Sequence, residues 1–162
     1  NTQTSLFEYA DGAVLEFGTR GGFTNDEGGV RIGNLFYGTK GWLWIEESGK
    51  KWQSYFGPKN EKGPGADSAD PNAEPTGLTT IEYPHYQNFV DAIRAGDPKM
   101  LTCDVLEGHL SSSLPHLGNI SYLVGHSLVF DGKSETFVDD KKADRLLTRD
   151  YRKGFELPKS FT

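Results

Sequence analysis

Three short runs of aromatic and β-branched residues make up the stretch NLFYGTKGWLWIEESGKKWQSYF, residues 34–56. These residue types favour strands over helices, because they fit the pleated, half-buried surface of a sheet. The breaks between the runs, at residues 38–41 and 47–50, are rich in glycine and polar residues that suit tight turns. The stretch therefore predicts three consecutive strands. Residues 57–79 follow, are nearly free of large apolar residues, and predict a long exposed loop.

A hairpin is predicted upstream of these strands, in SLFEYADGAVLEF, residues 5–17. Apolar residues alternate on both sides of Asp11-Gly12, a pair that supplies the positive φ angles of a tight turn. Residues 18–33 come next and hold six glycines. Glycine allows a chain reversal or a close backbone approach, so this segment predicts a turn region that leads into the next strands.

Two helices are predicted in the second half of the chain. In residues 85–95 the apolar side chains recur at the spacing of one helical face, namely at Tyr86, Phe89, Val90 and Ile93. In residues 104–125 a longer apolar stripe, Leu106, Leu110, Leu114, Leu117 and Ile120, is expected to be buried against the sheet. Asp104 is the predicted N-cap of this second helix. Pro115 removes one backbone donor within it and predicts a kink near Ser111.

The order of the predicted elements decides the fold class. Residues 127–138 predict a strand and a turn, and residues 139–148 predict a short helix capped by Asp139 or Asp140. Strands followed by helices indicate an α+β domain with an antiparallel or mixed sheet. A chain of 162 residues is long enough to bury one core, so residues 1–162 are predicted to form a single domain.

Composition excludes several classes of function. The formal net charge of −6 opposes non-specific binding to nucleic acid, which needs a basic surface. No run of about 18 apolar residues is present, so no membrane span is predicted. The single cysteine, Cys103, forms neither an internal disulfide nor a cysteine-based metal site. The chain begins without an initiator methionine or a signal peptide and reads as a fragment of a longer protein, for which the cytoplasm is favoured over export.

The glycine-rich segment has two interpretations. GGVRIG, residues 28–33, lacks the spacing of a dinucleotide-binding fingerprint, and no predicted helix follows it. It is either a turn that connects strands or a substrate-facing loop. In the second interpretation Asn25, Glu27 and Arg31 are the candidate substrate-binding residues, because an arginine with a carboxylate recognises hydroxyl or carboxylate groups well.

Histidines on the second helix are the other candidates. His109 and His116 are seven residues apart, hence about 10 Å along the helix axis, which is too far for a shared metal ion. Each is either a packed or hydrogen-bonded helix residue or a lone acid/base in a cleft. His109 is retained as a candidate substrate-binding residue. Serines 111–113 lack a nucleophile motif, and their hydroxyls are expected to bond carbonyl oxygens freed by the proline. A set of strand aromatics is either core and interface or a carbohydrate platform: Trp42, Trp44, Trp52, Tyr55 and Phe56.

Four segments resemble the C-terminal domain of the Gfo/Idh/MocA oxidoreductases, and they occur in the family's order. They are TQTSLFEYADGAVLEF, TNDEGGVRIGNLFYGTKGWLWI, HYQNFVDAIRAGDPKMLTCDVLEGHLSSSLPHLGNISYLVG and ETFVDDKKADRLLTRDYRKGFELP. The resemblance covers most of the chain except residues 57–79. It implies an α+β fold with an open, mostly antiparallel sheet and helices packed on one face. It also implies a partner domain upstream, a Rossmann domain that binds NAD or NADP.

The resemblance implies a function for the longer protein. That protein is expected to be an NAD(P)-dependent oxidoreductase acting on a sugar, polyol or derivative, with this domain supplying part of the substrate pocket and a homo-oligomer interface through the sheet face. The resemblance places the family's cofactor fingerprint and its Glu-Lys-Pro motif before residue 1. No catalytic residue, cofactor site or metal site is therefore expected in this fragment, which alone should not be an enzyme. Pro115 departs from the family, where a small residue such as cysteine is usual.

Two alternatives remain open at this point. The chain is a non-catalytic sugar-binding or dimerisation module, or it is part of an NAD-dependent glycosidase that cleaves by oxidation and elimination. The aromatic strands and the acidic composition fit the first alternative.

Overall fold

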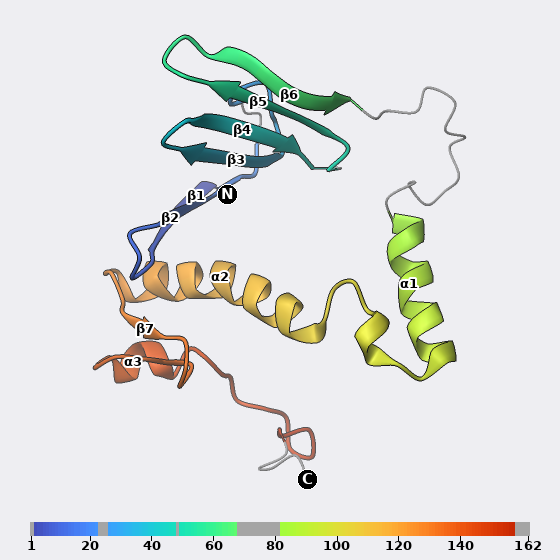
Figure 1. Ribbon diagram of the computed structural model, residues 1–162. Coiled ribbons are helices and arrows are strands. Elements are labelled where there is room, and N and C mark those ends of the chain that lie inside the picture. The colour runs from blue at the N-terminus through green and yellow to red at the C-terminus, as the bar shows by residue number, and fades with distance from the viewer. Residues whose placement is uncertain (1, 23–25, 48, 68–81, 158–162) are drawn as a thin grey trace. The chain divides into compact units, whose positions relative to one another are not determined.

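The computed structural model describes residues 2–22, 26–47, 49–67 and 82–157 (Figure 1). Contacts between residues divide the chain into two compact units. The first contains residues 1–2 and 19–104, and the second contains residues 3–18 and 105–162. Most of the N-terminal hairpin, residues 3–18, therefore belongs to the same unit as the C-terminal part of the chain.

The first unit contains a four-stranded antiparallel sheet in which consecutive strands are neighbours (Figure 1). Its strands are β3 (Gly33–Gly38), β4 (Gly41–Glu46), β5 (Lys51–Phe56) and β6 (Glu61–Asp67). The three strands predicted over residues 34–56 are confirmed, and the chain turns at the two predicted breaks. Leu35, Trp44 and Gln53 lie opposite one another across three strands, so their side chains share one face.

Strand β6 corrects part of the loop predicted over residues 57–79. Residues 61–67 pair with β5, and the rest of that segment from residue 68 onward lies outside the described residues. The centre of β6 has the sequence Gly-Pro-Gly, which has low strand propensity. The Gln53 amide donates hydrogen bonds to the carbonyl oxygens of Gly63 and Pro64, at 2.7 and 3.1 Å. These side-chain bonds hold a bulge at the sheet edge, where proline is tolerated, and local propensity does not reveal them.

Helix α1 (Glu82–Ala95) confirms the helix predicted over residues 85–95. It ends at Gly96, which has a φ of +64°. A short 3-10 helix, η1 (Pro98–Met100), follows it. The Asn88 side chain joins the two helices by donating a hydrogen bond to the Met100 carbonyl oxygen at 2.7 Å. The apolar residues of the predicted face are partly exposed, with Tyr86 at 54%, Phe89 at 55%, Val90 at 38% and Ile93 at 63%.

In the second unit, β1 (Thr2–Glu8) and β2 (Val14–Arg20) confirm the hairpin predicted over residues 5–17. The turn differs in one respect, because Gly12 has a positive φ of +87° and Asp11 does not. The Asp11 carboxylate instead accepts a hydrogen bond from the Ala13 backbone at 3.0 Å. A bond from the Gly12 N–H to the Tyr9 carbonyl oxygen, at 2.9 Å, closes the turn. The connection is therefore a longer hairpin loop with glycine alone in the left-handed region.

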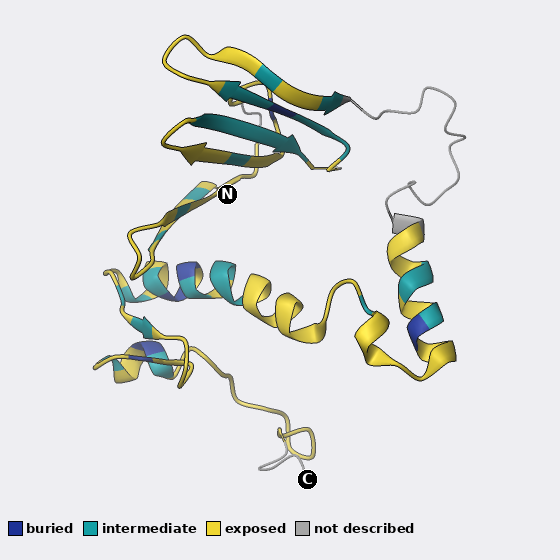
Figure 2. Ribbon diagram, viewed as in Figure 1, coloured by how far each residue is buried: buried dark blue, intermediate teal, exposed yellow. Residues whose placement is uncertain are grey.

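Helix α2 (Val105–Val124) confirms the helix predicted over residues 104–125. Its C-terminal half packs into the core, where Ile120 is 5% exposed (Figure 2). The expectation that the whole apolar stripe is buried is wrong, since Leu106 and Leu110 are 56% and 51% exposed. The core residues of the second unit pack on the C-terminal half of α2, and Figure 2 shows that the buried positions of the helix lie in this half.

The serines of α2 bond different carbonyl oxygens from those predicted. Ser112 Oγ donates to the Gly108 carbonyl oxygen at 2.6 Å, and Ser113 Oγ donates to that of His109 at 2.8 Å. The carbonyl group deprived of its partner by Pro115 is that of residue 111. The side chain of a serine in a helix bonds the carbonyl oxygen four residues before it. For the carbonyl group of residue 111, the residue four positions later is 115, which is the proline itself. The prediction that these serines compensate for the proline is therefore wrong.

A small hairpin and a short helix complete the second unit. They are β7 (Phe130–Asp131), β8 (Thr136–Phe137) and α3 (Lys141–Asp144). Phe137 and Ala143, at 4% and 0% exposure, form the core together with Ile120. Of the two predicted caps, Asp140 is the one used, because its Oδ1 atom accepts hydrogen bonds from the backbone of Lys142 and Ala143 at 3.0 and 2.9 Å.

Helices and antiparallel strands together confirm the α+β class for the described residues. The largest sheet is open, with β3 and β6 as its two edges. None of the helices in the described ranges is long and apolar enough to cross a membrane.

Candidate functional site

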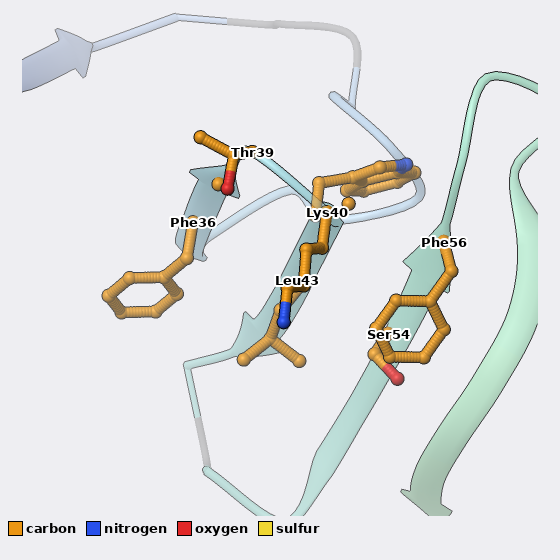
Figure 3. Close-up of a pocket in the computed structure, with 9 residues that line it drawn as sticks. Phe36, Thr39, Lys40, Leu43, Ser54 and Phe56 are labelled. Atoms are coloured by element: carbon orange, nitrogen blue, oxygen red, sulfur yellow. The ribbon is translucent and has the colours of Figure 1, made fainter.

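A hollow of about 330 Å³ lies on the four-stranded sheet, at the end where β3 turns into β4 (Figure 3). Its apolar floor consists of Phe36, Leu43 and Phe56, which come from β3, β4 and β5. Polar groups surround this floor, namely those of Thr39, Lys40 and Ser54. The hollow therefore combines an apolar surface with one ammonium group and two hydroxyl groups.

Strand register shows which other side chains share the face of this hollow. Phe36 lies opposite Leu43, and Leu43 lies opposite Ser54. Alternation along the strands adds Ile45 and Trp52 to the same face. We call this the hollow face, carrying Asn34, Phe36, Leu43, Ile45, Trp52, Ser54 and Phe56. Strands β3 to β5 contribute no charged side chain to it, and Phe36 and Phe56 are 53% and 46% exposed.

The opposite face, which we call the aromatic face, carries a row of stacked rings. The ring centroids of Trp42 and Tyr55 are 4.7 Å apart with an interplanar angle of 18°, and those of Tyr37 and Trp42 are 6.2 Å apart. Trp42 Nε1 also donates a hydrogen bond to Asn60 Oδ1 at 3.0 Å. The aromatic residues considered as one carbohydrate platform are therefore divided between two faces. On this face the Trp42 and Tyr55 rings stack on each other, so each ring has one surface already covered.

The glycine-rich segment forms a tight turn beside this row. Glu27 and Val30 exchange backbone hydrogen bonds of 3.0 and 2.9 Å around Gly28 and Gly29, whose φ angles of +59° and +87° are those of a type I′ turn. A Cβ atom on Gly28 would lie 2.9 Å from the Trp42 ring, so glycine permits this close approach. The interpretation as a turn is thereby favoured.

The glycine-rich turn does not fit a dinucleotide cofactor. The glycine-rich turn leads into strand β3, so it lacks the helix N-terminus that binds a pyrophosphate in dinucleotide-binding folds. Within the described ranges, no three histidine, cysteine, aspartate or glutamate side chains form a group that holds a metal ion.

The predicted residues of this segment are only partly brought together. Glu27 forms an ion pair with Arg20, a partner that the sequence did not reveal. Both side chains are about half exposed, at 54% and 42%, so the pair adds little stability. Arg31 is exposed, and Asn25 lies outside the described residues. Glu27 therefore does pair with an arginine, but the partner is Arg20 and not Arg31, which the sequence suggested.

His109 belongs to the second unit and has a carboxylate partner there. Its Nε2 atom lies 2.7 Å from Glu135 Oε1, in the turn between β7 and β8. The two side chains are 49% and 55% exposed. Glu135 has a φ of +52°, which is uncommon for a residue other than glycine. Sequence reasoning missed Glu135 because the pair joins residues 26 apart and forms only once the hairpin packs near α2.

A second histidine–carboxylate pair has a structural role. His126 Nε2 lies 2.7 Å from Asp140 Oδ2, and the same carboxylate caps α3. The Ala143 N–H and then the His126 ring lower the pKa of Asp140 below its usual value. Ser121 Oγ donates to the His126 carbonyl oxygen at 2.9 Å. The pair therefore ties the end of α2 to α3.

Comparison with known proteins gives a match to a protein family. A family model described as "Oxidoreductase family, C-terminal alpha/beta domain" matches residues 45–157, which is well over half of the chain. No curated protein matches the chain, and no solved structure does. The match begins in β4 at Ile45 and extends to the last described residue, so it includes the hollow face from Ile45 onward and the His109–Glu135 pair.

Proposed function

The chain belongs to the Gfo/Idh/MocA-type oxidoreductase family, as its C-terminal alpha/beta domain, and from this premise we propose its role in a longer enzyme. The enzyme oxidises or reduces a sugar, polyol or derivative with NAD or NADP, and this domain supplies part of the substrate pocket and the interface between subunits. The observation that carries the proposal is the family match over residues 45–157.

The family match and the glycine-rich turn, which leads into a strand and not into a helix, fit a division of labour between domains. A Rossmann domain upstream would bind NAD(P), which supplies hydride transfer when bound. The part of this chain that the structure describes would then contribute substrate contacts only. Glu27, Arg31 and His109 are the candidates within the described residues, and Asn25 is a candidate outside them. All four are polar groups suited to hydroxyl recognition.

The division of labour predicts different behaviour for the longer protein and this chain. We expect the longer protein to reduce NAD or NADP when supplied with one member of a panel of sugars and polyols. We expect the isolated 162-residue chain to show no cofactor binding in a fluorescence titration with NADH and NADPH. Tight binding by the isolated chain would contradict the proposal. Release of free sugar from a glycoside, in place of a keto-sugar, would point to the oxidation–elimination alternative.

The hollow face is the surface we assign to the subunit interface, with a second copy of the chain as its occupant. A chain with a net charge of −6 repels its own copies across an ordinary charged surface. The hollow face avoids this repulsion because β3 to β5 place no charged side chain on it. Its exposed Phe36 and Phe56 are of the aromatic type that is enriched in interface cores. Lys40 and Glu61 lie at its margins and give it opposite charges for a two-fold pairing.

Adjacent residues on opposite faces of β3 test this interface. We expect Phe36→Glu to shift the chain from dimer to monomer in sedimentation velocity, because a charge in an apolar interface core loses its hydration without a partner. Tyr37→Glu is the matched control, since Tyr37 projects from the aromatic face and is 78% exposed. We expect this control to remain dimeric. A wild-type chain that stays monomeric at high concentration would remove the interface from the proposal.

A further inference from the structure

We propose that Glu135 is a positioning residue for His109, which holds the imidazole so that Nδ1 accepts a hydrogen bond from a substrate hydroxyl group. The inference rests on the proposed function, in which a sugar-like molecule contacts this domain. Its starting point is the 2.7 Å contact between His109 Nε2 and Glu135 Oε1. A carboxylate that orients a histidine in this way is a recurrent arrangement in sites where the second ring nitrogen has a function.

The contact determines which ring nitrogen carries the proton. An ionised carboxylate only accepts hydrogen bonds, so the hydrogen in this contact belongs to the imidazole. Neutral His109 is therefore held with its proton on Nε2 and its lone pair on Nδ1. Within the described part of the chain Nδ1 makes no hydrogen bond, and the side chain is 49% exposed. With Nε2 bound to Glu135, Nδ1 is the ring nitrogen left to accept a hydrogen bond from a ligand.

The turn that carries Glu135 is fixed on both sides. Before it, the Asp131 carboxylate accepts hydrogen bonds from the Lys133 N–H at 3.0 Å and from Ser134 Oγ at 2.7 Å. After it, Phe137 is 4% exposed in the core of the second unit. A side chain mounted on such a turn keeps its geometry before any ligand arrives, as an orienting group must.

The backbone of Glu135 indicates that its side chain has a role. Its φ of +52° lies in the left-handed region, where glycine is the usual residue. Strained residues of this kind cluster at functional sites. Glycine would adopt this turn more easily, and what the glutamate side chain adds is the contact with His109.

The tautomer of His109 tests this role directly. In ¹⁵N NMR spectra of the 162-residue chain, we expect wild-type His109 to have its proton on Nε2. Glu135→Ala and Glu135→Gly should give a mixture of tautomers, and Glu135→Gln should keep part of the preference because its amide oxygen accepts the same bond. His126, which Asp140 holds, is the internal control and should not change. A wild-type His109 with the same mixture as Glu135→Ala overturns the proposal.

Stability and kinetics separate positioning from a simple tether between hairpin and helix. We expect Glu135→Gly to have a Tm at or above that of Glu135→Ala, because glycine suits the left-handed turn. In the longer protein, with the sugar identified by cofactor reduction, both variants should raise KM about tenfold with little change in kcat, the effect of one lost hydrogen bond. A wild-type KM in both variants overturns the role in binding. If no sugar is found, the proposed function fails, whereas the tautomer measurement still decides the role of Glu135.

Discussion

Gly41→Ala is expected to lower the free energy of unfolding of the first unit by about 3 kcal/mol or more, beyond the usual range for overpacking. A Cβ atom at this position would lie 2.0 Å from the Tyr55 carbonyl oxygen and 3.0 Å from the Phe56 Cα atom. Both are backbone atoms of β5, so no side-chain rotation relieves the contact. The strand pairing of β4 with β5 must open instead, at the edge of the hollow.

Tryptophan fluorescence during urea unfolding measures this effect specifically. The three tryptophans of the chain, Trp42, Trp44 and Trp52, all lie in β4 and β5, so their emission reports on this sheet. Gly38→Ala is the matched control in the same hairpin. Its Cβ atom would lie 3.7 Å from the nearest atom, the Gly41 carbonyl oxygen, which is ordinary contact. Equal urea midpoints for the two variants would show that β4 does not approach β5 as closely as described.

Gly118→Val is expected to destabilise the second unit by about 3 kcal/mol, at the upper end of overpacking effects. Gly118 lies on α2 where β1 crosses it, and a Cβ atom there would lie 2.5 Å from Ser5 Oγ and 3.0 Å from Ser5 Cβ. The hydroxyl can rotate away, but the Cβ atom cannot, and the methyl groups of valine extend the overlap. The N-terminal hairpin would then separate from the helix.

Gly108→Val provides the control on the same helix. No atom lies within 4 Å of a Cβ atom at Gly108, and valine has a slightly better helix propensity than glycine. We expect this variant to change the Tm by no more than a few degrees. Circular dichroism of the helical signal measures the Tm. If Gly108→Val lowers the Tm as much as Gly118→Val does, the effect comes from placing a β-branched residue in the helix. This result would contradict the close packing of Gly118 against Ser5.

Secondary structure was largely predictable where local patterns are strong. Alternation on both sides of Asp11-Gly12 predicts the hairpin, and aromatic runs with two glycine-containing breaks predict strands β3 to β5. Strand β6 was not predictable, because its Gly-Pro-Gly centre has low strand propensity and is held by pairing with β5 and by side-chain hydrogen bonds from Gln53 and Ser54. The reason for the difference is physical. The hairpin and strands β3 to β5 have their signals within their own segments of sequence, whereas β6 depends on its partner strand.

The sequence predicted which residue types form the candidate site but not which residues pair with one another. Sequence spacing excluded a metal shared by His109 and His116, and it excluded a dinucleotide fingerprint in the glycine-rich segment. It did not identify Arg20 as the partner of Glu27, nor Glu135 as the partner of His109. The exposure of Leu106 and Leu110 was also missed, because an apolar stripe shows which face of a helix can be buried but not how far its partners extend.

By itself the sequence determined the α+β class, the hairpin, the two long helices and the family, since each follows from periodicity, turn residues or an ordered set of segments. Only the tertiary structure decided which aromatic side chains share a face, which aspartate caps α3 and which carboxylate meets His109. These choices depend on strand register and on chain segments far apart in the sequence. A one-residue change of register reverses every side chain of a strand, and no local pattern specifies where two distant turns meet.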